Sequence, residues 1–239
     1  MDTYISIFSL EIPLHDVLRW FHIILAAYWL GGEWGVFNAS TNVANSSLSL
    51  EERYRHMTTA VMIDILPRSA IVWLLPVGFH MADNYGLSPV QGIWVNVVWV
   101  ATALWWYLLI WQAFKNRGTQ KYVTLTNIDN KIRWFLIPAL IFAGSYTIAT
   151  GKIITTGEEV SQYWFSMKII LFGMTLIIGL YMRYVMTGWV IAFRQLAAEG
   201  PSDAIETHIS NTLERAKKAA YVYWIFIGTI AFIGVTKPF

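Results

Sequence analysis

Six apolar stretches, each long enough to cross a bilayer, constrain this chain more than any other feature of its sequence. A helix needs about 20 mostly apolar residues to cross a hydrocarbon layer of roughly 30 Å. The stretches are too long and too evenly apolar for barrel strands, so helices must satisfy their backbone groups. The sequence therefore predicts an all-α, polytopic integral membrane helical bundle, a single domain with six transmembrane helices at about 17–37, 59–82, 92–114, 133–151, 162–190 and 219–236.

Composition agrees with this class and removes several functions. Hydrophobic residues make up 56% of the 239 residues and charged residues only 13%, which is about half the usual share in soluble domains. A net charge of +2 argues against a nucleic-acid partner, because such proteins concentrate basic charge on one face. The absence of cysteine excludes disulfides, thiolate metal sites and iron–sulfur clusters. The lipid bilayer is the first expected partner.

The basic residues predict which way the bundle faces. They concentrate in the connections after the first, third and fifth stretches, and the other connections hold few. Because cytoplasmic loops are enriched in Lys and Arg, both termini are expected outside the cytoplasm. In a bacterium this means the inner membrane, with both termini in the periplasm.

Two histidines are expected at a similar depth near that outer face. His22 lies near the start of the first stretch and His80 near the end of the second, and these stretches run in opposite directions. Paired imidazoles inside a helical bundle are a common way to hold haem b, so both are candidate iron ligands. The simpler alternative is that each hydrogen-bonds a neighbouring helix.

The residues around His22 extend this candidate cofactor site. Ala26, Trp29 and Glu33 share a helical face with it, and the small Ala26 leaves room for a flat macrocycle. Arg19 and Lys168 are expected near the same depth, where they can pair with haem propionates. His15 lies at the membrane edge and is a spare ligand.

A second candidate site lies deeper, where Glu33 and Arg68 are expected at a common level and Asp64 is one helical turn from Arg68. Unpaired ions there would cost several kcal/mol, so we expect Arg68 to pair with Asp64, Glu33 or both. Two acids and one base leave one carboxylate over. This predicts a proton path or a quinone site, and the alternative is a salt bridge that clamps two helices.

The pattern in "HIILAAYWLGG" (His22, Trp29, Gly31, Gly32) resembles the first helix of a loose group of bacterial membrane proteins. The group comprises the copper-resistance D (CopD) family, the HemJ-type protoporphyrinogen oxidases and the membrane domain of cytochrome-c-fused urate oxidases. "YWFSMKIILFG" is similar to a later, lysine-containing helix of the group, which would match Lys168 to its lysine. The resemblance implies a haem b protein.

Three functions remain open. The first is a haem b protein in electron transfer or redox chemistry, either a membrane oxidoreductase or a cytochrome b-type subunit, with protons or a quinone handled by Glu33, Asp64 and Arg68. Its partners would be other membrane subunits or a periplasmic electron-transfer protein. The second is transport of copper or another cation, with His22, His80 and Met81 as ligands. The third is an accessory scaffold subunit.

Three local patterns carry structural predictions. "SLEE" matches a capping box, so a helix should begin after Ser49 and run into the second stretch. Ile205, Ile209 and Leu213 predict an amphipathic helical segment leading into the sixth. Gly31 and Gly32 predict close packing of the first stretch against a neighbour.

Overall fold

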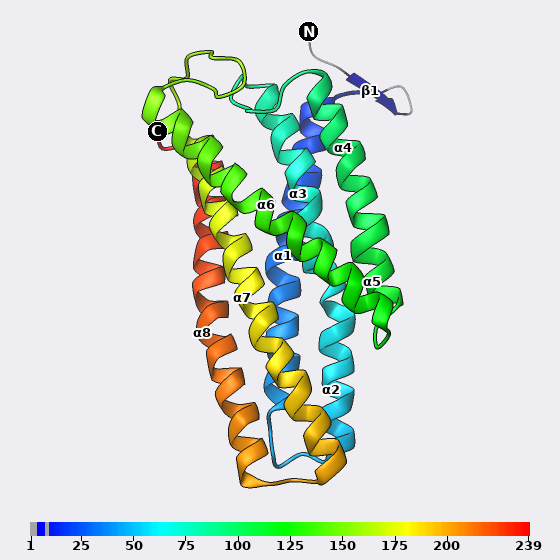
Figure 1. Cartoon of the computed structure of the whole chain (residues 1–239). Helices are drawn as coiled ribbons and strands as arrows, with labels where there is room; N and C mark the ends of the chain where they lie inside the picture. The colour runs from blue at the N-terminus through cyan, green and yellow to red at the C-terminus, as the bar shows by residue number, and fades with distance from the viewer. Residues whose placement is uncertain (1–3, 8–9) are drawn as a thin grey trace.

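The computed structural model describes residues 4–7 and 10–239, and these form an elongated helical bundle with a short hairpin at one end (Figure 1). The elements in chain order are β1 (Tyr4–Ile7), β2 (Leu10–Pro13), α1 (Leu14–Val43), α2 (Leu50–Ile63), α3 (Ile65–Asp83), α4 (Ile93–Trp105), the π-helical segment η1 (Trp106–Trp111), α5 (Gln112–Lys115), α6 (Gln120–Thr150), α7 (Trp164–Glu199) and α8 (Asp203–Thr236). The predicted all-α bundle is confirmed, and the antiparallel β1–β2 hairpin, which pairs Ile5 with Ile12, is an addition to it.

Five helical stretches are long and apolar enough to cross a membrane. They are Leu50–Asp83, Ile93–Lys115, Gln120–Thr150, Trp164–Glu199 and Asp203–Thr236. The predicted first stretch forms α1, which is 30 residues long but falls outside this apolar class. Its polar residues, His22 and Glu33 among them, dilute its hydropathy. A multi-pass membrane bundle is therefore supported, with five apolar spans.

Most helices are longer than the stretches predicted for them. The capping box is confirmed: Glu52 N–H donates to the Ser49 hydroxyl at 3.3 Å, and Ser49 N–H donates to the Glu52 carboxylate at 3.0 Å. The α2–α3 helix that follows is interrupted only at Asp64. Pro67 accounts for the break, because it has no N–H to donate to the carbonyl of Ile63.

The amphipathic segment is the first part of α8, continuous with the sixth stretch. It packs against the end of α7 and against α2, where Ile209 is buried beside Trp189 and Phe193. The buried Arg53 donates two hydrogen bonds to the Glu206 carboxylate, at 2.7 and 3.0 Å. The segment therefore belongs to a helical extension of the bundle and does not lie flat on a surface.

The two ends of the bundle are formed by different elements (Figure 1). The hairpin and both chain ends lie at the upper end, which we call the terminal end. The α1–α2 and α7–α8 connections lie at the opposite end, well below the turn between α5 and α6. The main hydrophobic core runs between α1, α3, α6, α7 and α8. Large apolar side chains point outward from α4, as suits a helix in contact with lipid: Trp94, Val97, Val100 and Leu104.

Close packing of α1 against α3 sets the position of the candidate site residues. A Cβ atom on Gly32 would lie 2.5 Å from Cδ of Pro67, whereas a Cβ on Gly31 would meet nothing within 4 Å. Close packing is therefore confirmed for Gly32 and is not found at Gly31. Helices α6 and α7 approach as closely, since a Cβ on Gly144 would lie 2.6 Å from the carbonyl oxygen of Ser166.

Candidate functional site: a cavity and a charge cluster

A cavity of about 610 Å³ lies between α1, α3, α7 and α8 toward the terminal end of the bundle. We call it the main cavity. One face of α1 supplies Arg19, His22, Ala26 and Trp29 to its wall. The helical spacing predicted a shared face for His22, Ala26 and Trp29, and Lys168 of α7 also lines this cavity. The structure thus brings five of the six predicted cofactor-binding residues to one cavity.

His22 lines this cavity from α1. Its Nδ1 atom is buried and has no hydrogen-bond partner among the residues that the structure describes. Gly78 of α3 lies opposite the His22 ring, and a Cβ atom added to Gly78 would be 3.8 Å from Cε1 of the imidazole. A buried polar nitrogen normally has a partner. Since no described residue hydrogen-bonds to His22, its imidazole in the cavity wall has no partner that would compete with a ligand.

The charged residues of the main cavity are all basic. Arg19, Lys168 and Lys237 line it, and no Asp or Glu is found in the described part of its wall. Lys168 lies 5.8 Å from the centre of the Trp164 ring, and a Cβ on Gly234 would come within 2.7 Å of its Nζ. The absence of a side chain at position 234 thus leaves room for the end of Lys168. The cavity is suited to a largely apolar molecule that carries negative charge.

His80 does not join His22 at the cavity, which corrects the predicted axial pair. It is absent from the described cavity wall, although Phe79, Met81 and Ala82 line it. The His80 ring turns toward α4 instead, where Trp99 Nε1–H donates to its Nδ1 at 3.3 Å. Neither the rotation of α3 about its axis nor the neighbour on its far side could be predicted from the sequence.

His15 is the second histidine of the cavity wall. Its ring nitrogens lie 3.3 Å from the Asn84 side-chain nitrogen and 3.4 Å from the Tyr85 hydroxyl. Because His15 and His22 stand two turns apart on the same helix, both approach the cavity from its α1 side.

The predicted pairing of Arg68 with Asp64 is confirmed. Arg68 Nε–H donates to Asp64 Oδ2 at 2.6 Å, and Arg117 approaches the same oxygen at 3.5 Å. Arg117 also donates to the carbonyl of Val61 at 2.6 Å. Burial lowers the pKa of Arg117, while the charge of Asp64 raises it. We call these three residues the Asp64 triad.

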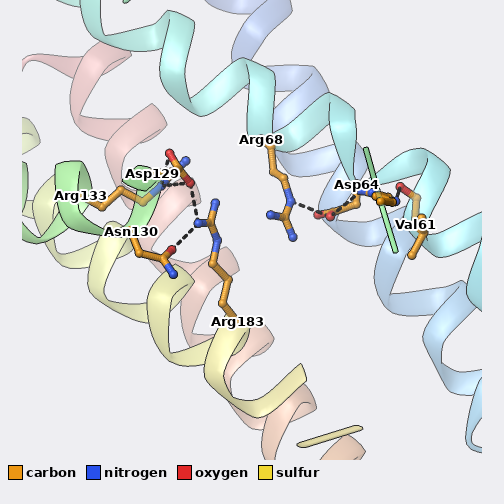
Figure 2. A network of polar contacts seen from close by, with 8 residues as sticks. Val61, Asp64, Arg68, Asp129, Asn130, Arg133 and Arg183 are labelled. Atoms are coloured by element: carbon orange, nitrogen blue, oxygen red, sulfur yellow. Dashed lines mark hydrogen bonds and ion pairs between the residues drawn. The ribbon is translucent and has the colours of Figure 1, made fainter. Parts of the chain in front are cut away.

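A second triad, which the sequence did not reveal, faces the first (Figure 2). Asp129 of α6 accepts from Arg133 Nε at 3.2 Å and from Arg183 Nη1 at 2.5 Å. Trp105 Nε1–H adds a hydrogen bond to Asp129 at 2.7 Å. Each aspartate thus holds two arginines, and we call this group the Asp129 triad.

Sequence contained a partial signal for the Asp129 triad. Asp129 and Arg133 stand four residues apart, the spacing of an ion pair on one helical face. The predicted fourth stretch began at 133, which left Asp129 in the preceding connection. Arg183 lies near the end of the predicted stretch 162–190, but α7 continues to Glu199, and the Arg183 side chain reaches across to α6.

Glu33 lies on α1 near both triads but pairs with neither. The described residues offer it no hydrogen bond or ion pair, and the charges of Asp64, Arg68 and Arg183 are the ones that act on it. Together with the triads it forms what we call the charge cluster. Glu33 is thus the carboxylate that the predicted Arg68–Asp64 pair leaves over, whereas the cluster as a whole contains four arginines and three acids.

Three aromatic residues lie at the inner end of the main cavity. Trp29 is 2% exposed, and its Nε1–H donates to the Tyr223 hydroxyl at 3.1 Å. The Trp29 ring meets the rings of Phe172 and Tyr223 edge-on, with centroids 5.8 Å apart in both pairs. Glu33 of the cluster follows Trp29 by one helical turn, so these rings lie between the main cavity and the charge cluster. We call the three rings the partition.

Comparison of the chain with protein-family models, with curated proteins and with solved structures finds no match. Within residues 4–7 and 10–239, no three His, Asp or Glu side chains converge as a metal-binding group. The residues of the cavity and of the cluster are therefore the basis for a functional proposal.

Proposed function

We propose that this chain is a membrane haem b protein in electron transfer or redox chemistry, with the tetrapyrrole in the main cavity. The observation that carries the proposal is the His22 imidazole, which lies in the wall of a cavity of about 610 Å³ and has no hydrogen bond to any described residue. That volume lies within the range of about 300–1,000 Å³ typical of cofactor and ligand pockets. The proposal is independent of the pairing with His80.

The residues of the cavity fit the chemistry of this group. An imidazole is a common axial ligand of haem iron, and His22 would supply it. Arg19 and Lys168 would pair with the two propionates: Lys168 has no ion pair with a described acid, and Arg19 pairs only with the exposed Asp16. When bound, the group supplies one-electron redox chemistry. The chain's own part is to ligate with His22, to neutralise carboxylates and to close the inner end with Trp29.

We also propose that α1 is a sixth membrane crossing. At 1.5 Å per residue its 30 residues extend about 45 Å, more than the hydrocarbon layer requires. The five apolar spans together with α1 make an even number of crossings, in keeping with chain ends at the same end of the bundle (Figure 1). The distribution of Lys and Arg places that end outside the cytoplasm, in the periplasm of a bacterium.

The charge cluster would exchange protons, or contact a quinone headgroup, on the opposite side of the partition. Glu33 supports this role, because it is the acid of the cluster without an ion-pair partner among the described residues. An intramembrane acid of this kind is expensive to keep and is commonly functional.

Absorption spectroscopy of the purified protein tests the proposal. Wild type should show a Soret band and sharp bands on reduction. His22→Ala should lower haem content about tenfold or more, whereas His80→Ala and the distant His208→Ala should retain it. A colourless wild type, or a normal spectrum in His22→Ala, overturns the proposal. Copper transport and a scaffold role would then be the functions to test.

A further inference from the structure

The charge cluster contains more guanidinium donors than the chain satisfies. Arg68 uses only its Nε toward Asp64, and no partner for its two Nη groups is found among the described residues. Arg183 uses only Nη1, toward Asp129 and Asn130. Arg133 has a buried Nη2 that lacks a partner within the described chain. Each arginine has five N–H donors, so much of this capacity is unused.

The two triads face each other with like charge. Each consists of one aspartate and two arginines, so each carries one net positive charge. In the view of Figure 2, Arg68 and Arg183 lie between the two aspartates, and the charge of Arg68 acts on Arg183. Like charges repel strongly in an interior that screens them poorly. Glu33 offsets one of the two positive charges, and one remains.

A small cavity lies on the Arg68 side of this gap, and Arg183 is not part of its described wall. It measures about 20 Å³ and is lined by Arg68 and Arg117 of one triad, by Asp129 of the other, and by Tyr122 and Thr126 of α6. That volume accommodates a water-sized group without rearrangement. The cavity lies beside the α5–α6 turn, and the ends of these helices carry the exposed residues Lys115 and Lys121.

We propose that the gap between Arg68 and Arg183 is a binding site for an oxyanion, a carboxylate or phosphate group. A guanidinium presents two parallel donors that match such a group, and two guanidiniums on opposite triads can hold it from both sides. Basic pockets between membrane helices near the membrane surface also bind anionic lipid headgroups. The anion is therefore either soluble or lipid-borne. It neutralises the net positive charge of the two triads that Glu33 does not offset.

Thermal unfolding of the full chain in a nonionic detergent tests the site without reference to haem. Sodium acetate and sodium phosphate are titrated against sodium chloride at matched ionic strength, and phosphatidylglycerol against phosphatidylcholine. Binding to the folded state raises the melting temperature in a saturable way. A rise with acetate or phosphate identifies a soluble anion, and a rise only with phosphatidylglycerol identifies a lipid headgroup. No saturable rise with any of them overturns the proposal.

Variants assign the effect to the two arginines. Arg68→Gln and Arg183→Gln should abolish the saturable shift, while Arg194→Gln, at an exposed position on the same α7, should preserve it. If a glutamine variant fails to fold, Arg183→Lys keeps the charge but loses the forked geometry. It should weaken the anion about tenfold. An unchanged shift in Arg183→Lys, or in either glutamine variant, contradicts the site. A normal haem spectrum in the same preparations separates this result from the proposed function.

Discussion

The main cavity and the charge cluster both contain basic side chains, but the two regions differ in how these side chains are paired with acids. In the cluster, each aspartate holds two arginines at ion-pair distance. In the cavity, Lys168 and Lys237 have no ion pair with any described acid, and Arg19 pairs only with the exposed Asp16. The comparison indicates that the cluster's charges hold helices together, whereas those of the cavity are free for a ligand.

The partition keeps these two environments apart. Trp29 closes the inner end of the cavity, and its partner Tyr223 is 3% exposed. Tyr223 hydrogen-bonds Trp29 of the cavity wall, and the charge of Glu33 in the cluster acts on it electrostatically. Four predictions, from the largest expected effect to the smallest, test the contrast.

Removing Asp129 should have the largest effect on stability. Asp129→Ala leaves Arg133 and Arg183 buried without their shared anion, and breaking a buried pair typically costs about 3–5 kcal/mol. Unfolding of the purified protein in detergent measures the loss of free energy. Glu214→Ala is the control, because Glu214 forms an exposed pair with Lys217 and should change stability by about 1 kcal/mol at most. Equal effects of the two variants would show that the cluster is not a structural anchor.

Widening the contact between α1 and α3 should come next. Gly32→Ala places a Cβ 2.5 Å from Cδ of Pro67, and overpacking of this kind costs about 1–3 kcal/mol. Gly31→Ala is the matched control, since its Cβ would meet nothing within 4 Å and alanine favours a helix. Because α1 supplies residues to both regions, Gly32→Ala should also weaken haem binding. Equal melting temperatures for the two variants would argue against the close packing.

Loosening the partition should have a smaller effect. Tyr223→Phe removes the oxygen that accepts the hydrogen bond from Trp29, and it leaves a buried N–H unsatisfied at a cost of about 1 kcal/mol. Tyr221→Phe is the control, because Tyr221 is exposed on the same helix. If Tyr223→Phe matches this control in melting temperature, the Trp29–Tyr223 bond contributes nothing to stability.

The sequence predicted the helical class well and the site only in part. Apolar length located the spans, and the spacing of His22, Ala26 and Trp29 placed them on the face that lines the cavity. Both follow from local periodicity. The rotation of α3, which turns His80 to Trp99, depends on packing between helices and has no local signal.

The charge cluster shows the same limit. The pairing of Asp64 with Arg68 could be predicted, because four residues separate them on one helical path. The contact of Arg183 with Asp129 joins α7 to α6 across 54 positions in sequence. Without that contact, the net positive charge of the whole cluster could not be predicted.

The smallest expected change in stability, and the sharpest test of the contrast, is at Lys168. This lysine is half-buried in the cavity wall, and no described acid pairs with it. Lys168→Met keeps the length of the side chain and removes a charge that is costly to hold inside a membrane protein. In the ligand-free protein we therefore expect an unchanged free energy of unfolding or a gain of up to about 1 kcal/mol, opposite in sign to Asp129→Ala. Haem affinity should fall about tenfold, because a propionate loses its partner. A ligand-free Lys168→Met that unfolds as readily as Asp129→Ala would mean that the cavity lysine also serves the fold.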